Sequence, residues 1–533
     1  MRIDRVKIID YKNLKDFTIN LDKSKMETIL LGQNATGKSN FIEALVLIFK
    51  HLDLESKPPF EYKIEYELRN FQIKVECINS RYKFQANTIL KANIHGEKKK
   101  LVSLNSITNK EFFVNKNIYL PKYVFTYYSG VSNKLKDHFD DHQKRFYEKS
   151  IKKGVTKDDV EDLRRLFYVQ LVHSYFVLLA YFSFDDEEKS SSKFLSEILN
   201  IKDLESILFV LNKPHWGKKG TFWGAKGLVN EFLQKVWEYS LAPIYNEENI
   251  PLDFRRSAKR ELLYLFIKGK DELREIASFY NSNTDFFKAL ESTYISDLIF
   301  EVRVKVKKQG VKGDITFKEL SEGEQQLLTV LGLLKFTRDE ESLILLDEPD
   351  THLNPIWKWK YREFLKDVVN KPETTQIIMN THDPLVIGSL VKEEVRVFKR
   401  DMELKKVVAA EPEVDPKGLG VAGILTSELF GLSSTLDKET LGLLKRRNEL
   451  ISKQDTEELS DNERAELRAL FEHLSSLGIN TTDRDPLYQK FIVAVGKREE
   501  FFIENPTEEN IKRQNEIAMD ILNEIISEEG GSE

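Results

Sequence analysis

Cysteine is almost absent from this chain of 533 residues, in which Cys77 is the single example. One thiol can form neither an internal disulfide nor a cysteine-rich zinc site, and this usage is typical of proteins in reducing compartments. The first residues contain no apolar stretch of secretory length, so no signal peptide is expected. These absences predict a cytoplasmic protein.

Long uninterrupted apolar runs are also missing. The longest covers residues 166–184, and Gln170, His173 and Ser174 interrupt it. A membrane-spanning helix needs about 20 predominantly apolar residues. We therefore expect a buried core helix here and no contact with a membrane.

An excess of positive charge is lacking, since the formal net charge is -6. No global basic field therefore indicates nucleic acid, and any such contact must come from a local patch. Hydrophobic residues make up 41% of the chain and charged residues 32%, which describes a globular protein with a sizeable core. The length corresponds to two to four domains of about 150 residues each.

The order of apolar patterns predicts an α/β fold. Buried runs such as "TILLG", "SLILLD" and "TTQIIMN" alternate with helical patterns, which indicates a mixed, mainly parallel sheet flanked by helices. Alternation at Tyr62, Ile64 and Tyr66 predicts an antiparallel β subdomain. We expect four segments: residues 1–139, the first half of an α/β head with the β subdomain; 140–295, a compact helical insertion; 296–400, the second half of the head; and 401–533, a helical C-terminal region.

The stretch "GQNATGKS", residues 32–39, fits the pattern G-x-x-x-x-G-K-[ST] between a strand and a helix. Glycines let backbone N–H groups surround phosphates, the lysine reaches the outer phosphates, and the last hydroxyl holds Mg²⁺. The positive end of the following helix adds to the same site. The predicted nucleotide-binding residues are Gly32, Gln33, Asn34, Ala35, Thr36, Gly37, Lys38, Ser39 and Asn40, with Ser39 also a metal ligand.

Two carboxylates follow the buried run "LILLDEPD". Hydrolysis of a nucleotide needs one group that holds the metal and another that orients or deprotonates water. We assign Asp347 to the metal and Glu348 to the water. The alternative is that both are ordinary solvated residues at the end of a strand, which a nearby phosphate loop makes less plausible. His382, in "NTHDP", lies just past another strand and is predicted to reach a terminal phosphate, although a lone histidine is more often structural.

"LSEGEQQ" presents Ser321 and Gly323 at the start of a helix, where backbone N–H groups bind anions. With this segment, the ordered motifs resemble those of ABC-type ATPases of the SMC, RecF and OLD kind. The resemblance implies ATP and Mg²⁺ as cofactors. It also implies an ATP-sandwiched homodimer, or a higher oligomer, in which the signature residues act in trans; they are Ser321, Glu322, Gly323 and Glu324.

This chain departs from the usual family pattern at several positions. Ala35 replaces a glycine of the phosphate loop, Glu322 replaces a glycine of the signature, and Asn354 stands where relatives often have aspartate. The glutamine of the Q-loop is not placed, and Gln143 is a candidate.

The interval between Ser39 and Ser321 is too long for the helical subdomain of a transport cassette. OLD-type relatives carry a metal-dependent nuclease domain after the histidine motif, but few strand signals follow residue 397. Asp483 and Asp485 lie in what reads as a solvated turn after a helix. We therefore expect that the chain is not itself a nuclease.

Softer motifs at residues 123–139, 221–227, 424–434 and 485–491 resemble the PtuA ATPases of Septu-type and retron-associated anti-phage systems. This resemblance implies a separate PtuB-like HNH nuclease regulated by the ATPase, and in a retron context a reverse transcriptase with its noncoding DNA. Two alternatives stay open: a RecF-like DNA-repair ATPase acting as a DNA clamp, and a self-contained OLD-like nuclease.

Residues 212–227 interleave lysines with Trp216, Phe222 and Trp223. Bases can stack on such aromatics while lysines neutralise phosphates, which would allow a DNA contact. The alternative, which we favour, is a loop whose aromatic side chains hold it to the insertion.

Overall fold

The structure is a computed structural model of the chain. It forms two compact units, Met1–Leu432 and Ser433–Glu533, which are described separately. The described residues are 1–90, 100–130, 134–150, 165–184, 194–251, 253–311, 313–336, 341–369, 372–401, 403, 405–432, 434–454, 458–477, 491, 495, 498–502 and 508–529.

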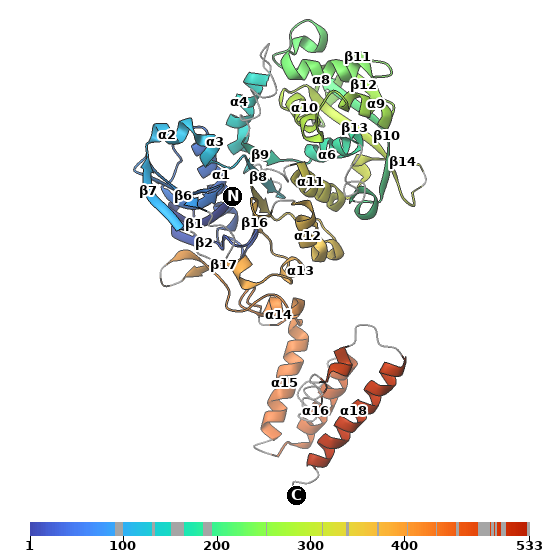
Figure 1. Cartoon of the computed structure of the whole chain (residues 1–533). Helices are drawn as coiled ribbons and strands as arrows, with labels where there is room; N and C mark the ends of the chain where they lie inside the picture. The colour runs from blue at the N-terminus through green and yellow to red at the C-terminus, as the bar shows by residue number, and fades with distance from the viewer. Residues whose placement is uncertain are drawn as a thin grey trace. The chain divides into compact units, whose positions relative to one another are not determined.

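The first unit is built on a seven-stranded sheet in the order β18-β17-β3-β16-β15-β8-β9 (Figure 1). Neighbouring strands from β17 to β9 are parallel, and β18 is antiparallel to β17. This mixed sheet confirms the predicted α/β head, and β18 extends it beyond residue 400. Its strands are β3 (Glu27–Gly32), β8 (Tyr123–Tyr128), β9 (Leu166–Val169), β15 (Ser342–Asp347), β16 (Gln376–Asn380), β17 (Val395–Asp401) and β18 (Lys406–Ala410).

The central strands are apolar along their length because both faces of this sheet are covered. In β15, Leu343 and Leu345 face one hydrophobic cluster, whereas Ile344 and Leu346 face another. Helix α1 belongs to the first cluster, and helices α6, α11 and α12 belong to the second. These helices are α1 (Lys38–Asp53), α6 (Val172–Ser183), α11 (Glu322–Phe336) and α12 (Pro355–Val368).

The predicted β subdomain is a six-stranded antiparallel sheet in the order β2-β1-β4-β5-β6-β7. Tyr62, Ile64, Tyr66 and Leu68 are buried while the residues between them are partly exposed, as their alternation predicts. Its strands are β1 (Arg2–Tyr11), β2 (Leu14–Asn20), β4 (Tyr62–Leu68), β5 (Phe71–Ile78), β6 (Arg81–Leu90) and β7 (Lys100–Ile107). Short helices α2 (Asn109–Val114) and α3 (Lys116–Tyr119) follow it.

The insertion is not mainly helical, which corrects the expectation for residues 140–295. It contains a second antiparallel sheet in the order β11-β12-β10-β13-β14, against which helices α8, α9 and α10 pack (Figure 1). The strands are β10 (Ile201–Asn212), β11 (Ile244–Pro251), β12 (Ser257–Ile267), β13 (Ile299–Lys308) and β14 (Asp314–Thr316). The helices are α4 (Asp140–Ser150), α8 (Gly227–Glu238), α9 (Lys270–Ala277) and α10 (Asn283–Ile295).

The apolar spacing of β10 explains why this sheet was missed. Ile201, Leu204 and Ile207 are buried at every third position, which resembles the period of a helix. The pairing of β10 with β13 shifts register three times, and the two shifts between Ile201 and Ile207 each add one residue between inward-facing side chains. Because β13 pairs with β10, this sheet also continues past residue 295.

The long apolar run at residues 166–184 forms strand β9 and the buried helix α6, which agrees with the predicted core location. Across the part of the chain that the structure describes, no helix combines the length and apolar character needed to cross a membrane. Two further short helices, α13 (Pro384–Ile387) and α14 (Gly420–Thr426), complete the first unit.

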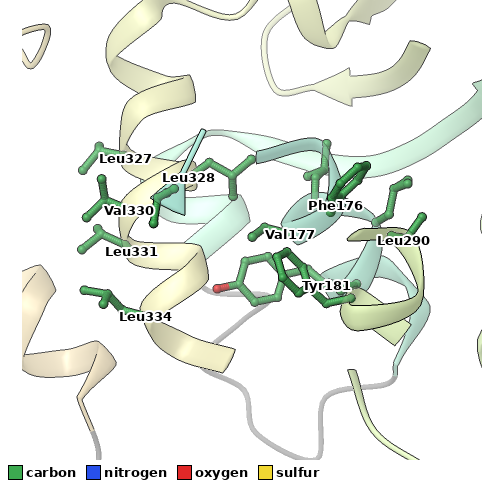
Figure 2. Close-up of a cluster of buried hydrophobic side chains, with 14 of the residues drawn as sticks. Phe176, Val177, Tyr181, Leu290, Leu327, Leu328, Val330, Leu331 and Leu334 are labelled. Atoms are coloured by element: carbon green, nitrogen blue, oxygen red, sulfur yellow. The ribbon is translucent and has the colours of Figure 1, made fainter. Parts of the chain in front are cut away.

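Helix α6 packs closely on α11, the helix that begins within the predicted signature segment. Figure 2 shows Val177 of α6 and Leu328 of α11 between the two helices, within the buried cluster. A methyl group built on Gly332 of α11 would lie 2.2 Å from Cγ1 of Val177. The glycine therefore allows the insertion helix to approach the α/β head.

The second unit contains helices α15 (Lys438–Gln454), α16 (Asp461–Ser476) and α18 (Glu508–Glu529). Ser460 and Glu463 form a capping box at the start of α16. The apolar faces of α15 and α16 meet in a small buried cluster around Leu450 and Leu470. Asp483 and Asp485 lie outside the described residues.

Gly332→Ala should destabilise the first unit by about 1–3 kcal/mol, the usual range for overpacking a core. The clash with stiff, buried Val177 opposes the gain of roughly 1 kcal/mol that alanine brings inside a helix. In a protein that already carries Val177→Ala, Gly332→Ala should lower the free energy of unfolding by less than it does in the parent. The measurement is the free energy of unfolding from urea titration.

Gly442→Ala in α15 is the matched control, because its methyl group would meet nothing within 4 Å. It should leave the stability of its own unit unchanged or slightly raised. A Gly332→Ala protein as stable as the parent would contradict the role of this close approach.

Candidate functional site

The predicted phosphate loop joins the end of β3 to the start of α1. Gly32 and Gly37 have φ values of 138° and 99°, which favour glycine. A methyl group on Gly32 would lie 2.3 Å from the carbonyl oxygen of Phe398, and one on Gly37 2.8 Å from Leu14 Cδ2. Gly37 caps α1 without a side-chain hydrogen bond, so the N–H groups of the first turn are available to an anion.

Ala35 takes a left-handed conformation, with φ of 64°, at the position where the family usually has glycine. This conformation costs an alanine about 1–2 kcal/mol. The side chain of Asn13, from the turn between β1 and β2, donates to the Ala35 carbonyl at 3.0 Å. Asn40 donates to Asn13 at 2.7 Å, so these two amides brace the strained loop.

Lys38 is folded against its own loop. Its Nζ donates to the carbonyl oxygens of Gly32 at 2.7 Å and Gln33 at 3.1 Å. Burial lowers the pKa of Lys38 to about 8, although Glu348 and Asp347 oppose that shift. Two of the three ammonium N–H bonds thus have backbone partners, and the third is available to a ligand.

Asp347 ends β15, and Asn380 ends the adjacent strand β16 directly opposite. Asn380 Nδ2 donates to Asp347 Oδ1, whereas Asp347 Oδ2 and Asn380 Oδ1 are buried without a hydrogen-bond partner among the described residues. Burial raises the pKa of Asp347, and the interactions with Asn380 and Ser39 oppose that rise. A cation would give these oxygens a partner.

This donor set fits Mg²⁺. Magnesium in nucleotide sites is held by one or two carboxylates together with substrate phosphates, and it prefers oxygen ligands. Asp347 and the Ser39 hydroxyl would supply the protein oxygens. The unpartnered Oδ2 of Asp347 is the observation that supports the fit.

Glu348 and His382 face one another across the site, with Glu348 Oε1 3.5 Å from His382 Nε2. Glu348 has a φ of 53°, and its backbone N–H donates to the Asn380 carbonyl at 2.9 Å. Burial lowers the pKa of His382, and the charge of Lys38 lowers it further. The histidine side chain is 36% exposed and the glutamate 44%, so both are accessible to water or a ligand.

Most of these groups line one cavity of about 260 Å³, whereas Asp347 is not among its lining residues. Its lining residues are Asn34, Ala35, Gly37, Lys38, Ser39, Asn40, Lys134, Glu348, Asn380 and His382. Of the other predicted loop residues, Gly32 and Gln33 hold Lys38, and Thr36 Oγ1 donates to the Gln33 carbonyl.

Sequence reasoning missed Asn380 and Lys134. Asn380 could have been found, because it ends the buried run beside the strand of Asp347. Lys134 lies within the softer motif at residues 123–139, which assigned it no role. Gln143, the Q-loop candidate, lies on α4 and is not among the lining residues.

The predicted signature residues lie at the start of α11 and do not line this cavity. Ser321 Oγ accepts from the Glu324 backbone N–H at 3.2 Å, and the Glu324 carboxylate accepts from the Ser321 backbone N–H at 2.9 Å. This pair is a capping box, a structural role that the motif alone did not reveal. A methyl group on Gly323 would lie 2.6 Å from the His352 carbonyl oxygen, so close packing also requires this glycine.

Gln326 connects the signature helix with the site. Its Oε1 accepts from the His352 backbone N–H at 3.1 Å, and its Nε2 donates to the Tyr127 hydroxyl at 3.2 Å. Glu322, the departure from the family pattern, lies 3.1 Å from His352 Nδ1. The signature segment is therefore tied to the loop that follows Glu348.

The aromatic side chains of residues 212–227 hold the loop in place. Phe222 and Trp223 are buried, and Trp223 Nε1 donates to Glu261 at 3.2 Å. Trp216 Nε1 donates to the Ser296 carbonyl at 3.1 Å. Burial leaves the rings of Phe222 and Trp223 unavailable for stacking on bases.

Comparison with known proteins gives relatives named as Septu and retron proteins. The Septu protein PtuA of Bacillus mycoides (strain KBAB4) is 28% identical over 260 residues, which cover 46% of this chain and 34% of that protein. The Retron Vc95 probable ATPase of Vibrio cholerae serotype O1 biovar El Tor is 22% identical over 502 residues, covering 85% of this chain and 84% of that protein. The match thus spans about a third of the PtuA relative.

The SMC head domain from Thermotoga maritima superposes with a TM-score of 0.32 and 12% identity, over 78% of this chain and 100% of that domain, a likeness too weak to support an argument. The family described as AAA ATPase domain matches residues 1–387, which include the phosphate loop, the Asp-Glu pair and His382. Because this match covers more than half of the sequence, the chain belongs to the AAA ATPase domain family.

Proposed function

We propose that this chain binds and hydrolyses ATP with Mg²⁺ and serves as the ATPase subunit of an anti-phage defence complex. The observation that carries the ATPase proposal is the convergence of Lys38, Ser39, Glu348 and His382 on one cavity beside the Asp347–Asn380 pair. Phosphoryl transfer depends on positioning and charge stabilisation, and these residues supply both.

Each group has a separate task in this proposal. The N–H groups of the loop and the ammonium of Lys38 bind the phosphates. Ser39 and Asp347 would hold the metal ion, which would offset negative charge on the phosphate oxygens when bound. Glu348 takes a proton from the attacking water as the bond from water oxygen to the γ-phosphorus forms and the bond to the leaving ADP oxygen breaks. His382, 3.5 Å from Glu348, holds the terminal phosphate and the water in place.

We also propose that two copies close around two nucleotides. Ser321, Glu322, Gly323 and Glu324 do not line the cavity of their own copy, while Ser321 and Glu322 are exposed at the start of α11. That helix terminus can therefore meet the γ-phosphate bound by a second copy, which would complete the site in trans.

The defence role rests on the similarity to a Septu PtuA protein and to a retron ATPase. In this proposal the chain is cytoplasmic, does not cut DNA itself, and regulates a separate HNH nuclease through its nucleotide cycle. In a retron context the complex would include a reverse transcriptase and its noncoding DNA.

Glu348→Gln should retain ATP binding and lose hydrolysis by about 10²–10⁴-fold, the usual contribution of a general base. The amide keeps the shape of the side chain but cannot accept the proton. Steady-state phosphate release and ATP affinity measure the two effects. Glu363→Gln, an exposed change on α12, is the control, and wild-type turnover by Glu348→Gln would refute the assigned role.

Mixing two inactive variants tests the shared site. Lys38→Ala removes the lysine that binds phosphate. Ser321→Arg places a bulky side chain at the start of α11 and prevents it from approaching the nucleotide of the second copy. A mixed dimer has one site built from two intact halves, so random mixing should restore about a quarter of wild-type hydrolysis. If each site is completed within one chain, the mixture stays inactive.

The nuclease proposal predicts that a neighbouring gene encodes an HNH protein that co-purifies with this chain. DNA cleavage by the pair at saturating ATP should differ between wild type and Glu348→Gln, because the variant holds the ATP-bound state. Equal cleavage rates, or an HNH protein that never associates, would contradict regulation by ATP.

A further inference from the structure

Lys134 is a second lysine in the cavity, and neither the motifs nor the roles assigned above use it. It lies between strand β8 and the short helix η1 (Lys136–Phe139), far in sequence from the phosphate loop. Its Nζ donates to Asn40 Oδ1 at 2.8 Å and lies 3.4 Å from Glu43 Oε2. Both partners are on α1, so Lys134 is held at the helix that receives phosphate.

The geometry of Lys134 parallels that of Lys38. Each ammonium has two oxygen partners that fix its position, and an ammonium has three N–H donors. Each side chain also lines the same cavity. Lys134 is 35% exposed, so its remaining donor can reach a ligand without first breaking its anchoring contacts.

Glu43 does not neutralise the charge of Lys134, because it has other cationic partners. This carboxylate is 4% exposed and also contacts Lys12 Nζ and, at 3.0 Å, His138 Nε2. Burial raises its pKa, but hydrogen bonds from His138, Lys12 and Tyr11 outweigh burial and lower the pKa to about 2. Glu43 therefore stays ionised and paired without Lys134, whose positive charge is left in excess beside Asn40.

We propose that Lys134 binds a phosphate group of the nucleotide directly, as a second phosphate lysine supplied by the segment after β8. This inference rests on the proposed ATP-binding function. Anions favour a site where a cation is already held in position by other partners, because little reorganisation is then needed on binding.

Lys134→Ala tests the proposal through ATP affinity, measured by titration calorimetry with Mg²⁺. Loss of a charge-assisted hydrogen bond should weaken binding about 10- to 100-fold. Lys134→Arg keeps the charge and should bind within a few-fold of wild type. Lys136→Ala, on the same segment and outside the cavity lining, is the matched control and should bind ATP as wild type does.

Glu43→Gln separates a direct contact from a bracing role. This change removes the negative charge of the Glu43 carboxylate but keeps Lys134. Direct binding of phosphate by Lys134 therefore predicts unchanged or tighter ATP affinity. If Lys134 acted only by fixing α1 through Glu43, both variants would weaken binding alike. Thermal unfolding of each variant verifies that the fold is retained.

Loss of ATP affinity in Lys134→Ala, with Lys136→Ala and Glu43→Gln unaffected, is the expected result. Unchanged affinity in Lys134→Ala, or an equal loss in Glu43→Gln, would overturn the inference while leaving the ATPase proposal intact. A wild-type chain that binds no ATP, or one whose affinity is unchanged by Lys38→Ala, would instead refute the proposed function and this inference with it.

Discussion

The in-register parallel pairing of β3, β16, β15 and β8 is the constraint on which the site depends. Asp347 lies opposite Asn380 on one side and Tyr128 on the other, and Asn380 lies opposite Leu30, two residues before the phosphate loop. Parallel strands in register end at the same edge of a sheet, so the loops that follow them must meet. The phosphate loop, the carboxylates, the histidine and the segment of Lys134 come from four such loops.

A sheet covered on both faces can hold backbone conformations that would not persist alone. Ala35 and Glu348 both have positive φ, and both border the cavity. Strain of this kind survives where surrounding contacts determine the conformation, and it often occurs at functional sites. Here Asn13 braces Ala35, while the carbonyl of Asn380 holds the backbone of Glu348. The buried strands thus stabilise the reactive groups in fixed positions before any ligand arrives.

Local patterns predicted the central strands and the β subdomain and marked Lys38, Asp347 and Glu348 as candidate site residues, because those features depend on residues adjacent in sequence. The insertion was misread because β-bulges spaced the inward residues of β10 three apart. Ser321 proved to be the cap of α11, a role that the motif did not reveal, because both a helix cap and an anion site are expected at the first turn of a helix. Gln326 and Lys134 lie within motifs, but no local pattern indicated their contacts.

The sequence by itself determined where a phosphate loop could form, since Gly32 and Gly37 permit backbone angles that other residues resist, and which runs had to be buried strands. Tertiary structure alone decided which distant side chains share the cavity and which aromatic rings are covered. Lys134 reaches Asn40, and Trp223 reaches Glu261, only because strand pairing and helix packing bring separate segments together. Backbone preference acts between neighbours in the chain, whereas electrostatic contacts and burial depend on proximity in space.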